Sequence, residues 1–224
     1  MGPLTADRPK PLVEVAGKPL LQHVLSAFPQ RLVSKFVVVT GNDSGPIETR
    51  FGSSFEGTPI EYVTQPTPRG LGDAVLQAEH AVTGTFAVIN GDNLVRGDLA
   101  GLVETHREAA ADATLLVEET SREQAKAGGV CVFDDNGTLT GYVEKPEEPP
   151  STVASAGAFV FEPVIFHAIR LSTPSERGEL ELTDAVDLLL EAGRRVETAR
   201  LDGRRLNVND PADVQAAEAL LKQP

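Results

Sequence analysis

Apolar residues along this chain fall into short β-branched runs that alternate with helical stripes. Residues 35–40 read KFVVVT and residues 85–90 read TFAVIN, and such continuous apolar runs are typical of strands buried on both faces. In residues 18–28 the apolar side chains recur every three or four positions, which predicts a helix packed against a sheet. The same patterns predict strands at 60–64, 113–118, 156–161 and 196–200, and helices at 72–81, 99–111, 163–169 and 183–192.

One hairpin interrupts this alternation. The sequence DNG at residues 135–137 separates strands at 130–133 and 139–144, and it is a strong signal for a tight turn. Strands that otherwise alternate with helices predict an α/β fold with a mostly parallel sheet and one added hairpin. The length fits a single domain over residues 1–224.

Two of the expected helices have recognisable start signals. Asp98 is a candidate N-cap for the helix at 99–111. Asp210 and Pro211 combine an N-cap acid with a proline at the first helical position, which predicts a last helix reaching about residue 221.

The composition limits the partners of the chain. The formal net charge is −13, from 33 acidic and 20 basic residues, which argues against nucleic acid because phosphate contacts need a basic surface. Cys131 is the single cysteine, so neither a disulfide framework nor a Cys-based metal site is available. No apolar run approaches the length of a membrane span, and we expect a cytoplasmic protein. The acidity also suggests a salt-loving source, a hypothesis that predicts an unfolding midpoint rising with KCl.

Asp92 is the first candidate for chemistry. It follows the strand at 85–90 after Gly91, and ligands of open α/β sheets bind beyond the carboxyl ends of strands. A carboxylate there can hold Mg²⁺, which prefers oxygen ligands and keeps substrate phosphates in its shell. Gly-Asp-Asn is also ordinary turn chemistry, so these residues alone leave a metal site and a plain turn equally open.

Gln65 and Gly70 lie in a turn rich in Pro and Gly, between the strand at 60–64 and the helix at 72–81. Such a turn lets a ligand approach the backbone and the helix N-terminus. A Gln side chain can both donate to and accept from the edge of a pyrimidine. A loop without a ligand is the alternative.

Lys10, Glu144 and Lys145 are candidates for binding phosphate and sugar. A Lys aimed at a triphosphate stabilises the charge that develops in nucleotidyl transfer. A carboxylate can accept hydrogen bonds from sugar hydroxyls, while a neighbouring Lys pairs with a sugar phosphate. The alternatives are a solvated surface Lys and a surface charge pair before a Pro-rich segment.

Taken in order, these motifs resemble those of the sugar-phosphate nucleotidylyltransferases, which include the glucose-1-phosphate thymidylyl- and uridylyltransferases and the N-acetylglucosamine-1-phosphate uridylyltransferases. Residues 2–21, GPLTADRPKPLVEVAGKPLL, are similar to the second half of that family's N-terminal signature. The resemblance implies a Rossmann-like three-layer α/β/α sandwich. It also implies transfer of a nucleotidyl group from UTP or dTTP to a sugar 1-phosphate, giving an NDP-sugar and pyrophosphate with Mg²⁺ as cofactor.

The resemblance also implies roles for individual residues, by position in the family's motifs. For Thr183 a plain N-cap is the alternative. The roles are catalysis by Lys10, Asp92 and Lys145; nucleotide contacts by Gln65, Gly70, Gly91 and Asp92; sugar contacts by Gly129, Glu144, Lys145, Gly157 and Thr183; and Mg²⁺ coordination by Asp92 and Asn207, with Asn209 as the other candidate.

The chain departs from the family in one respect, because the family's first strand and Gly-rich loop with its arginine are missing. That strand is normally central, so its loss predicts unpaired backbone and an open groove. We expect that the full protein carries roughly 10–25 more N-terminal residues, enough for one strand and one loop.

Two other functions stay open from the sequence. One is a non-catalytic relative that binds nucleotide or sugar phosphate, which the missing loop favours. The other is a branch of the same superfamily that uses GTP or CTP. No residue identifies which sugar 1-phosphate is the substrate. The oligomeric state stays open, and a homo-oligomer is one alternative.

Overall fold

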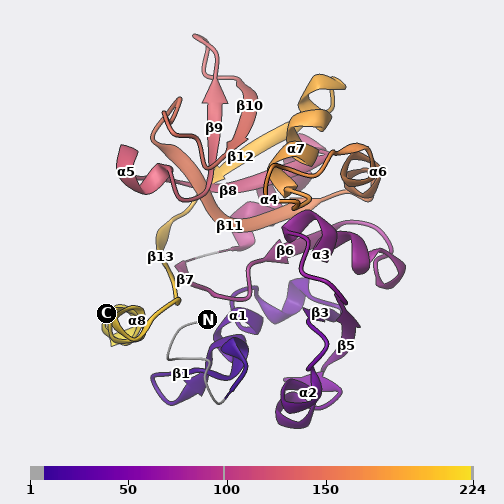
Figure 1. Cartoon of the computed structure of the whole chain (residues 1–224), viewed down its shortest axis with the longest axis vertical. Helices are drawn as coiled ribbons and strands as arrows, with labels where there is room; N and C mark the ends of the chain where they lie inside the picture. Colours follow the sequence, from indigo (N-terminus) through magenta and orange to yellow (C-terminus); the bar gives the residue numbers. More distant parts are fainter. Residues whose placement is uncertain (1–7, 98, 223–224) are drawn as a thin grey trace.

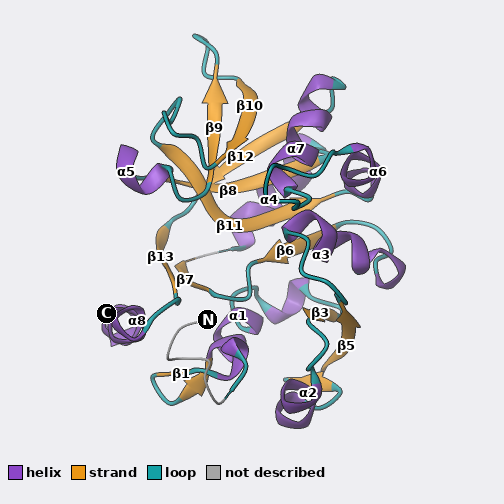
Figure 2. Ribbon diagram, viewed as in Figure 1, coloured by secondary structure: helices purple, strands orange, loops and turns teal. Residues whose placement is uncertain are grey.

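The chain folds into strands flanked by helices, as Figure 1 shows in a computed structural model that describes residues 8–97 and 99–222. A larger group of strands lies in the upper half of this view and a smaller group in the lower half. Helices lie around both groups, so the molecule has the expected α/β architecture (Figure 2).

The larger sheet is built around one long central strand, β11. Its order is β10-β9-β11-β8-β12, and β6 pairs with the second half of β11. The larger sheet is mixed and mainly antiparallel, which corrects the expectation of a mostly parallel sheet: β12 runs parallel to β8, while β11 is antiparallel to all its neighbours and β9 is antiparallel to β10. Antiparallel strands need no crossover helix between them, and none lies between β9 and β11. The strands are β6 (Phe86–Ile89), β8 (Ala113–Glu119), β9 (Gly129–Phe133), β10 (Leu139–Glu144), β11 (Val153–Phe161) and β12 (Val196–Arg200).

Helices cover both faces of this sheet, because successive side chains of a strand point to opposite sides. In β8, Leu115 and Val117 pack in one apolar core with helices α6 and α7, whereas Leu116 packs in another core with α4. All three side chains are almost completely buried. The expected three-layer α/β/α arrangement is therefore confirmed, with helices α4 (Ala100–Ala109), α6 (Val164–Leu171) and α7 (Leu182–Glu191), and a short α5 (Arg122–Ala125) before β9.

The smaller group carries the strand that the KFVVVT run predicts. Strands β3 and β5 are parallel, and β4 pairs antiparallel with β5. A short helix, α2, precedes β4 and was not predicted, because its Gly45-Pro46 start reads as a loop although Pro suits the first helical turn. The elements are β3 (Phe36–Thr40), α2 (Gly45–Phe51), β4 (Ser54–Phe55) and β5 (Thr58–Thr64), with α3 (Leu71–Gln77) following β5.

A two-stranded ribbon, which the sequence patterns did not predict, links the end of the chain to the centre of the molecule. β7 (Asn93–Gly97) pairs antiparallel with β13 (Gly203–Asn207). After β13 comes the last helix, α8 (Pro211–Lys222), at the left of Figure 1. Leu94, Val208 and Leu220 pack in one small core with residues near the start of the chain, where β1 (Glu14–Val15) and β2 (Lys18–Pro19) form a minimal hairpin.

A groove of about 630 Å³ separates β3 from β6. Apolar side chains of helices α1 (Leu20–Leu25) and α3 line it, including Leu25 and Val75. Within residues 8–97 and 99–222, β3 pairs only with β5, and β6 pairs only with β11. One edge of each strand therefore has no partner strand, and the groove lies between the two strands.

Helix boundaries account for most corrections. The helix expected at 18–28 is shorter, as α1 (Leu20–Leu25), because Pro19 is extended and the residue before Pro29 is disfavoured in a helix. The helix expected at 72–81 is α3 followed by a separate 3₁₀ turn, Glu79–Ala81. Two further 3₁₀ turns are Lys10–Leu12 and Gln30–Leu32.

Two turn and cap predictions are confirmed, and one cannot be compared. Asp210 caps α8, since its Oδ1 accepts from the backbone N–H groups of Ala212 (2.8 Å) and Asp213 (2.9 Å). The hairpin turn is present between β9 and β10. Asp98, the candidate cap of α4, lies outside the described residues. None of the helices described is long and apolar enough to cross a membrane.

Candidate active site

Lys10 is the centre of a cluster drawn from three distant segments. Its Nζ donates to Oδ2 of Asp92 and to Oδ1 of Asn209, each at 2.8 Å. The Lys10 and Asp92 side chains are 31% and 30% exposed, and an ion pair of that exposure contributes only about 0–1 kcal/mol to stability. Stability alone is therefore a weak reason for this convergence of side chains.

The β7–β13 ribbon brings these segments together. Asp92 follows β6 in a tight turn and precedes β7, while residues 208 and 209 follow β13. Asn93 stands opposite Asn207 in the ladder, and the backbone N–H of Val208 donates to the carbonyl of Asp92 at 2.9 Å. The ladder therefore holds the Asp92 backbone beside Val208, the residue between the two candidate asparagines.

The two asparagines have different partners. Asn207 Oδ1 accepts from Arg205 Nη1 at 3.2 Å, and Arg205 also pairs with Glu118 at 2.7 Å. Asn209 Oδ1 instead shares the Lys10 ammonium with Asp92. The structure thus brings Asn209 into contact with the Lys10–Asp92 pair. Asn207 lies opposite Asn93, the residue after Asp92, and its side chain contacts the Arg205 guanidinium instead.

The Asp92 cluster offers suitable donors for a Mg²⁺ ion. Carboxylate and amide oxygens that already converge on one cation are the ligand types that Mg²⁺ takes, with water and substrate phosphates filling the remaining positions. Within the described part of the chain, no group of three or more His, Cys, Asp and Glu side chains could hold a metal ion. An ion here would therefore depend on substrate and water for most of its ligands.

Gly157 is required by close packing against the Asp92 turn. Its φ is +70°, and a Cβ atom would come within 2.9 Å of Asn93 Nδ2 and 3.2 Å of Asn90 Nδ2. Asn93 Nδ2 donates to the carbonyl of Ala156 at 2.6 Å, and the backbone N–H of Asn90 donates to the carbonyl of Gly157 at 3.0 Å. The glycine thus lets β11 approach the turn that holds Asp92. At Gly91, by contrast, a Cβ would meet nothing within 4 Å.

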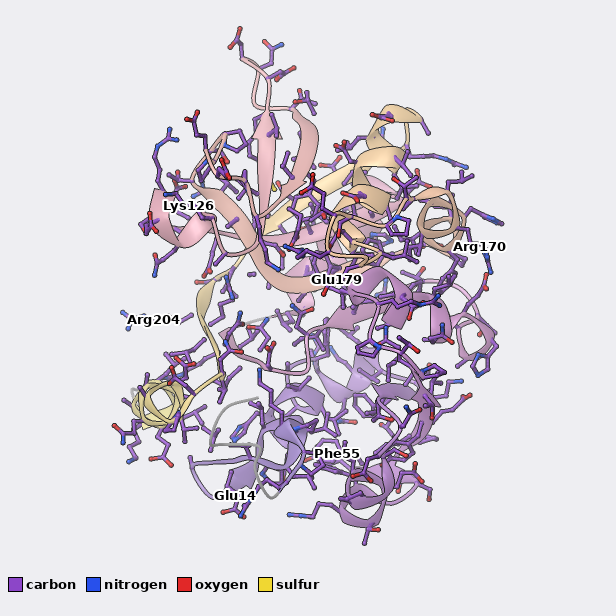
Figure 3. The ribbon with its side chains drawn as sticks, in the orientation of Figure 1. Glu14, Phe55, Lys126, Arg170, Glu179 and Arg204 are labelled. Atoms are coloured by element: carbon purple, nitrogen blue, oxygen red, sulfur yellow. The ribbon has the colours of Figure 1, made fainter. Side chains whose placement is uncertain are left out.

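Gln65 and Gly70 form a second cluster at the end of β5. Gln65 Nε2 donates to the carbonyl of Gly70 at 3.2 Å and to Oδ2 of Asp73 at 2.7 Å. Gly70 has φ +95°, and a Cβ atom there would lie 2.6 Å from the carbonyl oxygen of Leu180. The segment that carries Glu179, labelled near the centre of Figure 3, packs directly against this turn.

Glu144 and Lys145 form a third cluster at the end of β10. Lys145 Nζ lies 3.3 Å from Glu144 Oε1, and the Lys145 backbone is left-handed, with φ 43°. Burial raises the pKa of Glu144, and the Lys145 charge opposes that shift.

Arg177 brings a second cation to this cluster. Its Nη2 is 2.7 Å from Glu181 Oε1 and 3.9 Å from Glu144 Oε1. The Arg177 guanidinium and the Lys145 ammonium therefore both lie beside Glu144, in a place suited to an anionic group with nearby hydroxyls.

Comparisons with known proteins show which family the chain belongs to. The family model described as "Nucleotidyl transferase" matches residues 1–204. The UTP–glucose-1-phosphate uridylyltransferase AglF of Haloferax volcanii is 41% identical over 221 residues, which cover 99% of this chain and 91% of that protein. The chain belongs to the nucleotidyl transferase family. The enzyme class expected from the sequence, a nucleotidyltransferase, is thereby confirmed.

Two further proteins are similar to this chain. The glucose-1-phosphate thymidylyltransferase of Streptomyces antibioticus is 33% identical over 215 residues, which cover 95% of this chain and 60% of that protein. The crystal structure of a UDP-glucose pyrophosphorylase complexed with UDP-glucose aligns with a TM-score of 0.88 at 24% identity, covering 97% of this chain and 91% of that one. The second similarity concerns the fold, which matches the Rossmann-like α/β sandwich expected here.

One residue with an implied sugar contact, Gly129, has a structural reason of its own in this nucleotidyl transferase, whereas the described residues show none for Thr183. A Cβ atom at Gly129 would come within 2.3 Å of the Tyr142 hydroxyl, so this glycine makes room for a buried ring. Thr183 is not an N-cap, because α7 begins at Leu182 with Glu181 at the N-cap position. Thr183 is buried, and its Oγ1 has no hydrogen-bond partner among the described residues.

Sequence patterns did not identify Arg177 or Asp73. The role of each residue depends on side-chain contacts that such patterns do not show. Arg177 reaches Glu144 from 33 positions further along the chain. Asp73 is only eight positions from Gln65, and a polar residue in a helix that otherwise buries apolar side chains was the signal that could have drawn attention to it.

Proposed function

We propose that this chain transfers a nucleotidyl group from UTP or dTTP to a sugar 1-phosphate in an Mg²⁺-dependent reaction that releases pyrophosphate. The observation that carries the proposal is the shared contact of Lys10 Nζ with Asp92 and Asn209. These contacts place an ammonium group at the carboxyl end of β6, where ligands of α/β sheets bind and where a cation can stabilise the charge of a triphosphate.

In the proposed reaction, an oxygen of the sugar phosphate attacks the α-phosphorus of the nucleotide in line. The bond from that phosphorus to the bridging oxygen breaks, and pyrophosphate leaves with the bridging oxygen. No covalent enzyme intermediate is needed. Lys10 would leave its Asp92 and Asn209 partners and donate to the triphosphate, where it stabilises the charge on the leaving group.

Asp92 would be the main ligand for Mg²⁺, with the amide oxygen of Asn207 or Asn209 as the second protein ligand. A bound Mg²⁺ would neutralise negative charge on the phosphates. Lys10 would leave Asp92 when that carboxylate holds the metal ion, because the ammonium and the metal would compete for it.

The other two clusters supply the binding sites for the two substrates. The turn with Gln65 and Gly70 would offer the Gln65 amide to the nucleobase. Glu144 would accept hydrogen bonds from sugar hydroxyls, while Lys145 and Arg177 would hold and orient the sugar phosphate.

The groove between β3 and β6 supports a further proposal about the fold. A strand supplied from upstream of Met1 would pair with both free edges and fill the apolar space between α1 and α3. Thr40 and Asn90, at the carboxyl ends of β3 and β6, each have a buried side-chain oxygen without a partner among the described residues. A loop that follows such a strand would lie near these two atoms.

The proposal is tested by pyrophosphate release with Mg²⁺, UTP or dTTP and a panel of sugar 1-phosphates. Turnover by this chain, or by a chain extended upstream, would support it. If both chains bind nucleotide but release no pyrophosphate with any acceptor, the result would instead support the hypothesis of a non-catalytic binding protein. Rates with GTP or CTP that equal or exceed those with UTP and dTTP would instead assign the enzyme to another branch of the superfamily.

A further inference from the structure

Asp73 is an almost fully buried carboxylate in the first turn of α3. Its side chain is 1% exposed, and three side chains donate to it. Gln65 Nε2 lies 2.7 Å from Oδ2, while Arg69 Nη2 and Gln77 Nε2 lie 2.9 and 3.4 Å from Oδ1. A carboxylate beside a guanidinium has only acceptor oxygens, so all three contacts run toward Asp73.

These contacts fix the direction of the Gln65 amide. The two N–H groups of Gln65 Nε2 are used by Asp73 Oδ2 and by the Gly70 carbonyl, at 2.7 and 3.2 Å. A flipped amide would place Oε1 against these two acceptors, which is unfavourable. Gln65 therefore keeps Oε1 as the only amide atom that it can offer to a ligand.

We propose that Asp73 is a positioning residue that sets the nucleobase preference through Gln65. An amide that presents only an acceptor recognises a pyrimidine whose ring N3 carries a proton, as in uracil and thymine. Cytosine has an unprotonated N3, so its lone pair would face that of Gln65 Oε1. The inference rests on the proposed function, in which Gln65 faces the base of the nucleotide.

The contacts around Asp73 make the substitution Asp73→Asn a direct test of this proposal. In Asp73→Asn, Arg69 and Gln77 still donate toward the position of Oδ1, and this holds the new carbonyl oxygen there. The new NH₂ group then faces Gln65 and donates to Oε1, which turns the Gln65 amide around. The variant would present an N–H group to the base, and this suits cytosine rather than uracil.

A purely structural role for Asp73 predicts something different. An acid in the first turn of a helix stabilises that helix, so its loss would weaken the fold and reduce the binding of every nucleotide together. The ratio of affinities for two pyrimidine nucleotides would then stay the same. That ratio is the quantity to measure.

The experiment is equilibrium binding of UTP and CTP to the wild-type chain and to Asp73→Asn. We expect the wild type to prefer UTP, and the variant to lower the ratio of UTP to CTP affinity by at least about tenfold, as expected when one buried hydrogen bond is exchanged for a repulsive contact. Asp73→Glu, which keeps an acceptor-only carboxylate, should retain the wild-type ratio. Asp187→Asn is the matched control, because its carboxylate accepts from the Tyr142 backbone N–H at 3.1 Å in another part of the fold.

A second measurement needs no folded Asp73→Asn protein. UTP methylated at ring N3 lacks the proton that Gln65 Oε1 would accept, and the wild type should bind it at least about tenfold more weakly than UTP. Equal binding of the methylated nucleotide would overturn the inference, as would an unchanged ratio in a folded Asp73→Asn variant. In either case pyrophosphate release by the wild type would leave the proposed function standing. Binding of neither UTP nor CTP by this chain and by a chain extended upstream would overturn both.

Discussion

Lys10 and Asn209 are 199 positions apart in the sequence, and their side chains meet at 2.8 Å. The Asn209 end of this contact is held by the last helix, because the backbone N–H of Asn209 donates to Asp213 Oδ2 at 2.8 Å. The Lys10 end is held by a 3₁₀ turn between prolines. The start and the end of the domain therefore close the candidate site from both sides of Asp92.

Replacing Lys10 tests whether this contact serves catalysis. We expect Lys10→Met to lower kcat/KM for the nucleotide by about 100-fold to 1000-fold, the usual effect of removing one group that stabilises transition-state charge. The free energy of unfolding should change by no more than about 1 kcal/mol, because the Lys10–Asp92 pair is partly exposed. Steady-state kinetics and urea unfolding check the two expectations.

Lys35 provides a matched control for that substitution. Its ammonium lies 2.7 Å from Glu61, and the two side chains are 37% and 38% exposed, so Lys35→Met removes an ion pair of similar geometry away from Asp92. This variant should keep wild-type kinetics. Equal losses of activity in the two Lys variants would mean that Lys10 acts only through the fold.

Titration with Mg²⁺ tests the proposed metal ligands. Asp92→Asn removes the one negative charge of the proposed site and should abolish pyrophosphate release at any Mg²⁺ concentration. Loss of the second ligand should only raise the Mg²⁺ concentration that gives half the maximal rate. Asn207→Ala and Asn209→Ala, titrated with Mg²⁺ under the same conditions, show which asparagine fills this place, and a wild-type titration curve in both variants would contradict an amide ligand.

The sequence predicted the parts of the fold that depend on local patterns. Continuous apolar runs identified β3 and β6, and Asp210 was recognised as a cap because its partners are only two and three residues away. The β7–β13 ribbon escaped prediction, since its strands are short and polar and form only because distant residues pair. The same limit applies to the site: Asp92 could be predicted from its place after a strand, whereas the contact between Lys10 and Asn209 could not.

Glu144 should make the stability of the protein depend on pH. Burial raises its pKa in the folded state above the unfolded value, despite the opposing Lys145 charge. Between those two pKa values the native state holds more protons than the unfolded state, so Glu144 causes stability to fall as pH rises through this interval. Glu144→Gln should remove that loss. The free energy of unfolding of the variant, minus that of the wild type, should therefore be larger at neutral pH than at about pH 4.

Urea unfolding of both proteins across that pH range provides the measurement. Glu147→Gln is the control, because it removes an exposed carboxylate from the neighbouring segment. If the difference in unfolding free energy between wild type and Glu144→Gln were the same at every pH, the folded-state shift of Glu144 would be refuted.

The groove between β3 and β6 predicts that an upstream extension stabilises the domain. A strand of about five or six residues is typical, and one placed in this groove would form hydrogen bonds with both free edges and bury the apolar residues of α1 and α3. Together these gains should raise the melting temperature by at least about 5 °C, since each 1 kcal/mol corresponds to about 2–4 °C in a domain of this size. The measurement compares the melting temperature of this chain with that of a chain extended by the residues that the codons before Met1 encode.

A second extended chain with two prolines in the middle of the added segment separates strand pairing from mere length. Proline removes the N–H that a sheet ladder needs, so this chain should melt like the original one. It should also retain the tendency of open strand edges to associate, which gel filtration detects. Equal melting temperatures for all three chains, or an in-frame stop codon directly before Met1, would show that the groove is not completed by an upstream strand.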